Sequence, residues 1–333
     1  MTEPATQARR PAGAPPRSDV AIRTDDLRKT YTSSRGAVDA VRGISLEVGS
    51  GEFFGLLGPN GAGKSTTIGM LTTLIVPTGG HAWVAGIDVV ASPVGVKRRI
   101  GVVPQNNTLD MQLSVSENLE FRSRFFGLGR REAARRAEQL LAAFGLTDRR
   151  RAMATDLSGG QARRLMIARA LVHKPDVLFL DEPTAGLDPQ TRVNLWDTLR
   201  ALHAEGQTIL LTTHYMEEAE ALCERVAVID HGEVLASGTV EELKQGAGAD
   251  IVITVRYDGG VPDGLAAIGD RPDVSKVDIE ADQVRVFARG ADGLLGELVT
   301  AGTRAGLTVR DAAQLKPSLE TVFLTLTGRE YRE

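Results

Sequence analysis

Cysteine is nearly absent from this sequence. The single cysteine, Cys223, excludes any intramolecular disulfide in a chain of 333 residues. An isolated cysteine is most often a small buried apolar side chain, and a chain without disulfides suits a reducing compartment. We therefore expect Cys223 to be buried and the chain to be cytoplasmic.

Long apolar runs are also missing. The longest are short, such as Val177-Leu178-Phe179-Leu180, which a charged residue ends, whereas a membrane-spanning helix needs about 18 or more apolar residues. The first eighteen residues hold Pro, Ala, Thr and Arg and have no apolar core of a signal peptide. We expect a disordered tail over residues 1–18 and no membrane span.

An excess of one charge sign is absent too. The 39 Lys and Arg residues against 43 Asp and Glu residues give a formal net charge of -4. This balance argues against a broad nucleic-acid-binding surface, so we expect no nucleic acid among the partners. The length favours a core domain of about 220 residues with a smaller second domain.

Strand and helix patterns alternate along the first part of the chain. Phe53–Leu57 is a continuous apolar run, as in a strand buried on both faces, and it leads through a glycine-rich loop into a helix predicted over 66–74. Further along, predicted strands alternate with predicted helices, over 177–180, 189–205, 208–212, 216–223 and 225–230. This order indicates an α/β fold with a mostly parallel sheet covered on both faces.

Two regions depart from this alternation. Residues 113–153 carry helix formers with helical apolar spacing, which predicts a helical insert. The composition loosens at Gln245-Gly246-Ala247-Gly248, where we place the boundary between a core domain over 19–244 and a C-terminal α+β accessory domain over 245–333. The predicted order beyond that boundary, β-α-β-β-α-β-α, is typical of a ferredoxin-like unit.

A phosphate-binding pattern lies between a predicted strand and a predicted helix. The segment Gly58-Pro59-Asn60-Gly61-Ala62-Gly63-Lys64-Ser65 matches G-x-x-x-x-G-K-[ST]. Glycines let the backbone wrap closely around phosphates, and the amides up to Thr66 open a helix whose N-terminus favours anions. Lys64 suits the β- and γ-phosphates, and Ser65 suits Mg²⁺. The pattern predicts a nucleotide site but leaves GTPases, kinases and many ATPases open.

A second anion site is predicted at Leu157-Ser158-Gly159-Gly160-Gln161. A chance match to LSGGQ in a chain of this length is on the order of 1 in 2,000 from average residue frequencies. Ser158 is a natural N-cap for the helix that follows, and the two glycines leave backbone amides bare at its N-terminus. One nucleotide does not need two such sites in one subunit, but two subunits placed head to tail do.

With these motifs the chain resembles the ATPase subunits of ABC transporters, over about residues 20–240. In that family the signature segment of one subunit caps the γ-phosphate held by the phosphate loop of the other. The resemblance implies a P-loop NTPase core with a helical subdomain, ATP and Mg²⁺ as ligands, and a second copy of the chain as partner. It also implies that the signature residues act on the nucleotide in trans, namely Ser158, Gly159, Gly160 and Gln161.

The family's catalytic motifs follow in chain order. Asp181 and Glu182 end an apolar strand, and the resemblance assigns Mg²⁺ to Asp181 and orientation of the attacking water to Glu182. Gln105 in VVPQNN matches the glutamine that touches Mg²⁺ or the water. His214 after TILLTT matches the histidine that contacts the γ-phosphate. The implied metal ligands are Ser65, Gln105 and Asp181, and the implied catalytic residues are Glu182, His214 and Gln105.

Two further positions match family features. Asp188 in Gly-Leu-Asp is expected at the dimer interface. Tyr31 stands where the family keeps an aromatic residue that stacks on adenine, with Val38 beside it.

The C-terminal part narrows the resemblance. The segment Lys316-Pro317-Ser318-Leu319-Glu320-Thr321-Val322-Phe323-Leu324 is similar to drug- and antibiotic-exporter ATPases of the daunorubicin-resistance type, as is TILLTTHYMEEAEALCERVAVIDHGEV. Such subunits act with a separate integral membrane permease and export hydrophobic compounds or lipids. The resemblance therefore implies an ATPase at the cytoplasmic face of the cell membrane. A helix that packs through Leu319, Val322, Phe323 and Leu326 is also expected here.

Two alternatives stay open at this point. The first is an ABC ATPase of translation, DNA repair or Fe–S assembly, although the chain has one core, no long coiled coil, and an extra C-terminal domain. The second is a regulatory module that senses ATP without hydrolysing it, against which the intact Glu182 and His214 argue.

Overall fold

The computed structural model describes residues 18–34, 36–246, 251–262, 265–288, 293–315 and 318–327. All but the last residue of the expected tail over 1–18 lies outside these described residues. Contacts divide the chain into two compact units between Ser237 and Gly238, whereas the sequence places the boundary at 244–245. Cys223 is buried, as predicted. No helix in the described ranges is long and apolar enough to cross a membrane.

The first unit contains an antiparallel sheet that the sequence does not predict. Its strand order is β2-β1-β4-β5, with β1 over Val20–Ser33, β2 over Gly36–Gly49, β4 over Gly79–Val84 and β5 over Ile87–Asp88. The strand β1 pairs antiparallel with its neighbour β2 and with the distant β4. In β1 the consecutive residues Ala21–Thr24 are buried together with Leu27, whereas in β2 burial alternates through Ile44, Leu46 and Val48.

The second sheet of this unit has the order β10-β9-β3-β8-β7-β6. Its strands are β3 (Phe53–Leu57), β6 (Ile100–Val103), β7 (Val177–Asp181), β8 (Thr208–Thr213), β9 (Arg225–Asp230) and β10 (Glu233–Thr239). The pairs from β6 through β7, β8 and β3 to β9 are all parallel, which confirms the predicted mostly parallel sheet. Because parallel strands end at one edge, the loops after β3, β7 and β8 meet there.

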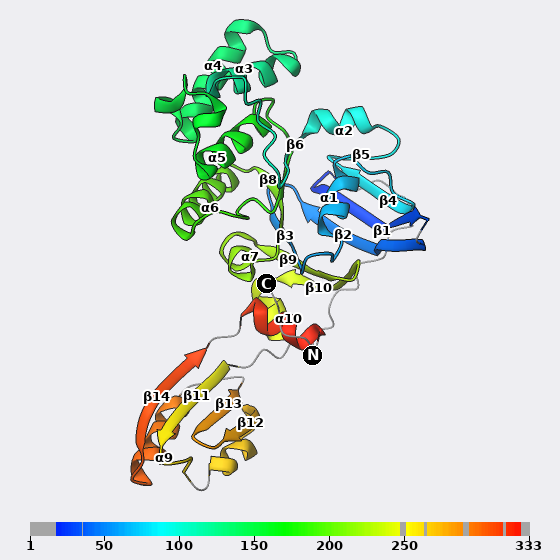
Figure 1. The fold of residues 1–333 in the computed structure, drawn as a ribbon. Helices are drawn as coiled ribbons and strands as arrows, with labels where there is room; N and C mark the ends of the chain where they lie inside the picture. Colours follow the sequence, from blue (N-terminus) through cyan, green and yellow to red (C-terminus); the bar gives the residue numbers. More distant parts are fainter. Residues whose placement is uncertain are drawn as a thin grey trace. The chain divides into compact units, whose positions relative to one another are not determined.

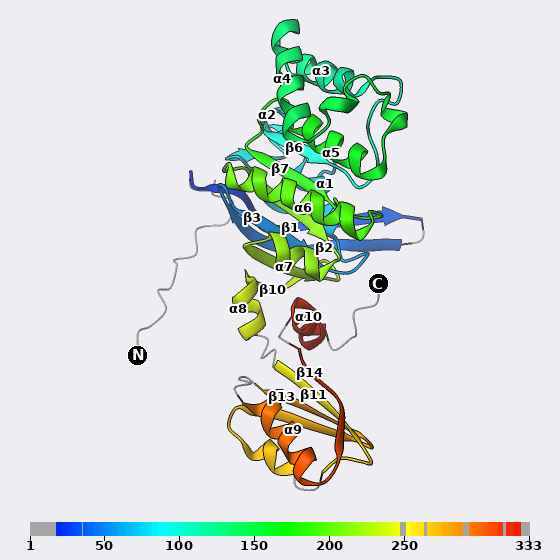
Figure 2. The ribbon, with the colours of Figure 1, turned by 90° about the vertical axis from the view of Figure 1, so that its left-hand side faces the viewer.

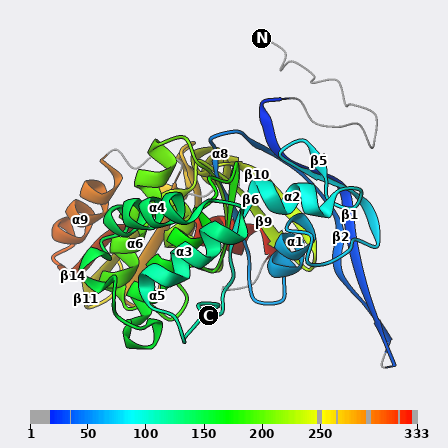
Figure 3. The ribbon, with the colours of Figure 1, turned by 90° about the horizontal axis from the view of Figure 1, so that it is seen from above.

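Helices cover both faces of this parallel sheet. Helix α1 (Lys64–Leu71) lies on one side, and α5 (Gly159–Ala170) and α6 (Pro189–Ala204) lie on the other (Figures 1 and 3). The short helices α2 (Pro93–Arg99) and α7 (Met216–Leu222) complete the layers. The predicted insert contains α3 (Val115–Phe125) and α4 (Arg130–Ala143), which Figure 2 shows beyond the β6 edge of the sheet.

The second unit is a four-stranded sheet of order β12-β13-β11-β14 with antiparallel pairs. Its elements are α8 (Val240–Gly246), β11 (Ile251–Asp258), β12 (Val274–Glu280), β13 (Gln283–Ala288), α9 (Leu294–Arg304), β14 (Thr308–Leu315) and α10 (Leu319–Thr327). A 3₁₀ helix, Leu265–Asp270, takes the place of the first predicted helix. The element order otherwise agrees with the prediction.

This second unit has its own core. Residues Ile253, Val255 and Tyr257 on β11 pack with residues of β13 and α9, and the Tyr257 hydroxyl donates to Leu298 O at 2.9 Å. On α10, Leu319, Val322 and Phe323 are buried, as predicted. Leu326 was predicted to pack as well; it lies on the same helical face, in the last turn of α10, but its side chain is exposed.

Candidate functional site

The phosphate loop lies between the end of β3 and the start of α1, and its close packing requires glycine. A Cβ on Gly58 would lie 2.1 Å from the backbone oxygen of Ile229, at the end of β9. Gly63 has a φ of 102°, and a Cβ there would lie 2.5 Å from the oxygen of Ala40 on β2. Helix α1 begins at Lys64 rather than at the predicted residue 66, so both Ser65 and Thr66 belong to its first turn.

Lys64 is almost completely buried, with 4% of its surface exposed. Its ammonium donates to the oxygens of Gly58 and Pro59 at 2.7 and 3.1 Å, and it lies 3.4 Å from Glu182 Oε1. Burial lowers the pKa of Lys64, and the negative charges of Glu182 and Asp181 oppose this shift. The loop therefore holds a desolvated cation whose partners inside the protein are two carbonyls and one carboxylate.

Hard oxygen donors converge beside this cation. Asp181 Oδ1 accepts from Ser65 Oγ at 3.2 Å and from Thr212 Oγ1 at 2.6 Å. The described residues contain no group of three or more His, Cys, Asp or Glu side chains that could hold a metal ion by themselves. Mg²⁺ in phosphoryl-transfer sites is bound by one or two protein oxygens together with substrate phosphates, so this donor set fits Mg²⁺.

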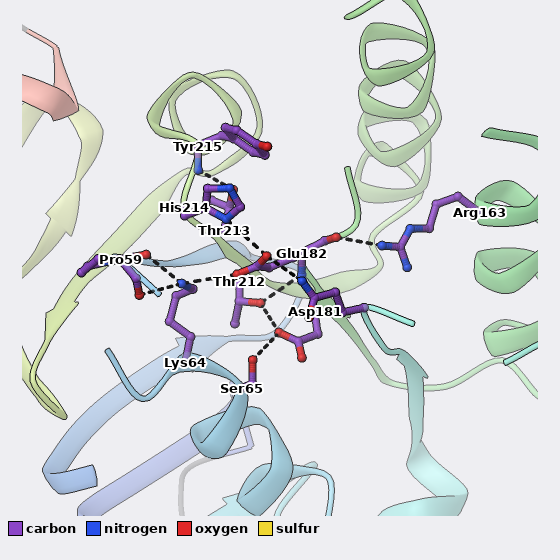
Figure 4. Close-up of polar contacts among 12 residues, drawn as sticks. Pro59, Lys64, Ser65, Arg163, Asp181, Glu182, Thr212, Thr213, His214 and Tyr215 are labelled. Atoms are coloured by element: carbon purple, nitrogen blue, oxygen red, sulfur yellow. Dashed lines mark hydrogen bonds and ion pairs between the residues drawn. The ribbon is translucent and has the colours of Figure 1, made fainter. Parts of the chain in front are cut away.

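Glu182 lies at the centre of the site. Its backbone has a φ of 46°, which is unfavourable for a residue with a Cβ, and its amide donates to the oxygen and the hydroxyl of Thr212, each at 3.1 Å. Its Oε2 accepts from Gln105 Nε2 at 3.1 Å and lies 3.2 Å from His214 Nδ1. Figure 4 shows how the segments after β3, β7 and β8 supply Lys64, Glu182 and His214. The structure thus brings together Lys64, Ser65, Gln105, Asp181, Glu182 and His214.

Arg163 on α5 is a member of this site that the sequence analysis missed. Its guanidinium is buried and donates to the backbone oxygens of Pro104 and Glu182, at 2.7 and 2.8 Å. Arg163 therefore fixes the backbone of Pro104, which precedes Gln105, and the backbone of Glu182. The neighbouring Arg164 donates instead to Phe144 O at 3.1 Å. Sequence spacing does not distinguish the two arginines, because only the tertiary packing of α5 decides which one points at the site.

The signature segment forms the start of α5. Ser158 is the N-cap, as predicted, and it forms a reciprocal capping box with Gln161, at 3.3 and 3.1 Å. Gly159 and Gly160 follow, and a Cβ on Gly160 would lie 2.2 Å from Thr191 Cγ2 on α6. Asp188 caps α6 by accepting from the amide of Thr191 at 3.0 Å.

Within one chain the signature segment and the phosphate loop stay apart. Among the described residues, Ser158 forms hydrogen bonds only within the first turn of its own helix, with Gln161 and Ala162. Helices α1 and α5 lie on opposite sides of the parallel sheet (Figures 1 and 3). The bare amides at the start of α5 therefore do not join the cluster around Lys64.

Tyr31 lies on the β1–β2 hairpin opposite Val38, and both side chains are exposed, at 42% and 63%. The ammonium of Lys29 lies 5.1 Å from the centre of the Tyr31 ring. Two residues beyond Val38, Ala40 on β2 approaches Gly63 of the phosphate loop. An exposed ring and an apolar neighbour on the strand that borders the loop suit the stacking of a flat base.

Comparison with known proteins identifies the family of this chain. A family model described as ABC transporter matches residues 41–185. A daunorubicin resistance ATP-binding protein of Streptomyces coeruleorubidus is 41% identical over 95% of this chain and 98% of its own length. A linearmycin resistance ATP-binding protein of Bacillus subtilis is 37% identical over 94% of this chain and 100% of its own. A solved dimeric ATP-binding cassette in a post-hydrolysis state, bound to ADP and Pi, has a TM-score of 0.60 and 29% identity, covering 66% of this chain and 98% of that one.

Proposed function

The chain belongs to the ATP-binding proteins of ABC transporters, of the daunorubicin-resistance type, and on this premise we propose that it works as an ATP-driven dimer that powers a separate membrane permease. As a member of this family it binds ATP and hydrolyses it. Beyond ATP hydrolysis, we propose the dimer, the roles of the site residues, the magnesium ion, the membrane partner and the cargo.

The separation of the two anion sites is the observation that carries the dimer. One site has a cation, hard oxygen donors and a carboxylate, at Lys64, Asp181 and Glu182. The other site is the capped N-terminus of α5, on the far side of the sheet. A second copy in the opposite orientation would bring its Ser158 helix N-terminus to the phosphate held by the first. The dimeric state of the similar solved cassette supports this arrangement.

The residues around Glu182 have the chemistry that hydrolysis needs. We assign to Lys64 and the loop amides the binding of the β- and γ-phosphates. Glu182 orients the attacking water and accepts its proton at Oε2, the oxygen that accepts from Gln105 and lies 3.2 Å from His214 Nδ1. Bound Mg²⁺ would neutralise phosphate charge, with Ser65, Asp181 and Gln105 as its protein ligands. Tyr31 stacks on the base, and Asp188 lies at the dimer interface.

Partner and cargo are proposed from the relatives and from an exposed apolar surface. On α3 of the helical insert, Phe121 and Phe125 are exposed at 66% and 70%, one helical turn apart. Exposed aromatic pairs of this kind are unusual unless a partner covers them, and we assign this surface to the permease. The chain would then lie peripherally at the cytoplasmic face of the membrane. By similarity to resistance proteins, the cargo is a drug, an antibiotic or a lipid-like hydrophobic compound.

Co-expression tests the proposal. The chain is produced with a candidate membrane permease, the membranes are solubilised, and the complex is purified through a tag on the permease. We expect the chain to copurify, and replacing Phe121 and Phe125 by serine to release it while leaving its ATP binding intact. A chain that never copurifies, and that shows no ATPase activity with or without membranes, would support the sensor alternative instead.

A further inference from the structure

A buried guanidinium lies behind the catalytic groups and is bonded to carbonyls alone. Only 6% of the surface of Arg163 is exposed, and its guanidinium donates to the backbone oxygens of Pro104 and Glu182 at 2.7 and 2.8 Å. Among the residues that the structure describes, it forms no ion pair with an acidic side chain. An arginine stays charged in proteins, and burying a charge without a countercharge is unfavourable, so this position calls for a specific role.

The two accepting carbonyls belong to the segments that carry the hydrolytic side chains. The Pro104 oxygen lies in the peptide plane that leads into Gln105, and because a peptide unit is planar, fixing its oxygen also fixes where the next residue begins. The Glu182 oxygen belongs to a residue whose amide already donates to the oxygen and the hydroxyl of Thr212, each at 3.1 Å. Both peptide planes around Glu182 are therefore held.

This double support matters because the backbone of Glu182 is strained. Its φ of 46° is unfavourable for a residue with a Cβ and persists only where the surrounding structure holds it. The Glu182 carboxylate accepts from Gln105 Nε2 at 3.1 Å, so Arg163, Gln105 and Glu182 belong to one closed ring of contacts. Without Arg163, Gln105 and Glu182 lose the common anchor that sets the distance between them.

Helix α5, which carries this arginine, has a second proposed task at its N-terminus. Its N-cap is Ser158, which we assign to the nucleotide held by the other subunit, and Arg163 follows five residues later in the same helix. Further along α5, Arg169 donates to the hydroxyl of Thr108 at 2.7 Å, three residues after Gln105. One helix therefore points its N-terminus toward the second subunit and its arginines toward the catalytic segments of its own chain.

We propose that Arg163 is a positioning residue for ATP hydrolysis that acts within its own chain, by anchoring the backbone before Gln105 and the backbone of Glu182 to helix α5. This inference rests on the proposed dimer and on the proposed roles of Glu182 and Gln105. The guanidinium bonds only to backbone oxygens, so its loss changes where the reacting side chains lie and leaves their chemistry intact. A misplacement of about 1 Å at a reacting group can cost on the order of 100-fold in rate.

Steady-state kinetics of two substitutions in the full chain form the first test. Arg163→Met removes both bonds, and we expect kcat to fall between about 10- and 100-fold. Arg163→Lys keeps the charge and can reach one carbonyl but lacks the planar fork, so we expect a smaller fall of about 3- to 10-fold. KM for ATP should stay within about twofold of wild type in both variants, because the contacts of Lys64 in the phosphate loop are untouched.

Arg136→Met is the matched control. Arg136 on α4 also donates to two backbone oxygens, those of Leu171 and Val172, at 2.7 and 3.2 Å. These oxygens lie at the end of α5 that is remote from Ser158. The control loses the same kind of contact with the same helix, so Tm should fall in both methionine variants, whereas kcat should fall only in Arg163→Met. If Arg163→Met fails to bind ATP, Arg163→Lys is compared with Arg136→Lys instead.

Mixed dimers show in which chain Arg163 acts. A Ser158→Arg chain keeps its phosphate loop and Glu182, and a Lys64→Ala chain lends it an intact signature segment, so the two chains together build one composite site. Adding Arg163→Met to the Ser158→Arg chain should lower the recovered activity between about 10- and 100-fold. Adding it to the Lys64→Ala chain should leave the recovered activity within about twofold, because Glu182 of that chain serves the disabled site.

Four results would each overturn the inference. They are an unchanged kcat in Arg163→Met, a rise in its KM that matches the loss in kcat, an equal loss of kcat in Arg136→Met, and an equal loss from either placement in the mixed dimer. A mixture that recovers no activity would instead contradict the proposed dimer, and the comparison of kcat with the Arg136 control would still decide the role of Arg163.

Discussion

Replacing Glu182 by glutamine separates the binding of ATP from its hydrolysis. In the structure, Oε1 of Glu182 faces the Lys64 ammonium at 3.4 Å, and Oε2 faces Gln105 and His214. An amide of the same shape can keep one acceptor in this position but cannot take up a proton from water. General base catalysis contributes about 10²- to 10⁴-fold, so kcat should fall by that factor, or about 3–5 kcal/mol in the barrier.

The affinity of the Glu182→Gln variant for ATP should rise or stay unchanged, although its kcat falls. In the wild type, the phosphates compete with Glu182 for Lys64, because the two side chains form an ion pair that is almost fully buried. Glu182→Gln removes that competitor but leaves the carbonyl contacts of Lys64 with Gly58 and Pro59. We expect the Kd to be unchanged or to fall by up to about tenfold, which corresponds to about 1.4 kcal/mol.

Two assays on the same preparation decide this prediction. Isothermal titration calorimetry gives the Kd for ATP, and phosphate release under saturating ATP gives kcat. Glu205→Gln, an exposed carboxyl at the end of α6, is the control for loss of one negative charge. A Glu182→Gln variant that turns over ATP within about threefold of wild type would refute the general-base role, because it would leave under 1 kcal/mol for it.

Two further predictions concern the phosphate loop. Gly58→Ala places a Cβ 2.1 Å from the Ile229 oxygen, so the loop and β9 must separate at a cost of about 1–3 kcal/mol. Tm should fall by roughly 2–10 °C. Gly206→Ala, whose Cβ meets no atom within 4 Å but whose φ is 88°, is the control for backbone strain without a clash and should lower Tm less. Burial holds the pKa of Lys64 below its usual range, and bound phosphate should raise this pKa again. At alkaline pH the binding of ATP should therefore take up protons. The affinity for ATP should fall as the pH rises through the lowered pKa of Lys64. Calorimetry in two buffers of different ionisation enthalpy measures this uptake, and finding none, or the same uptake in Lys64→Met, would contradict it.

The local motifs were predictable from sequence because each one is a contiguous segment with its own physical logic. The glycines of the phosphate loop and the Ser158 cap behave as their residue types require. The antiparallel sheet was not predictable, because β1 pairs with β4 about sixty residues away, and the pattern within a strand does not identify its partner.

The contacts that support the catalytic groups were missed for the same reason. Arg163 donates to carbonyls of two distant segments, and Glu218 is fully buried and accepts from Trp196 of α6. In the sequence, Arg163 is one of several arginines in a helix, and Glu218 is one of several acids in a turn. Only tertiary packing distinguishes them from their neighbours Arg164 and Glu217.

Subunit complementation tests most directly whether each active site is shared between two chains. Lys64→Ala disables the phosphate loop, and Ser158→Arg blocks the α5 N-terminus, so each variant alone should lack ATPase activity. When equal amounts are mixed and allowed to exchange, half of the dimers should be mixed, and each should contain one undamaged composite site. We expect recovery of about one quarter of wild-type activity. If both sites were built within single chains, no mixture could recover activity, and that result would refute the shared site.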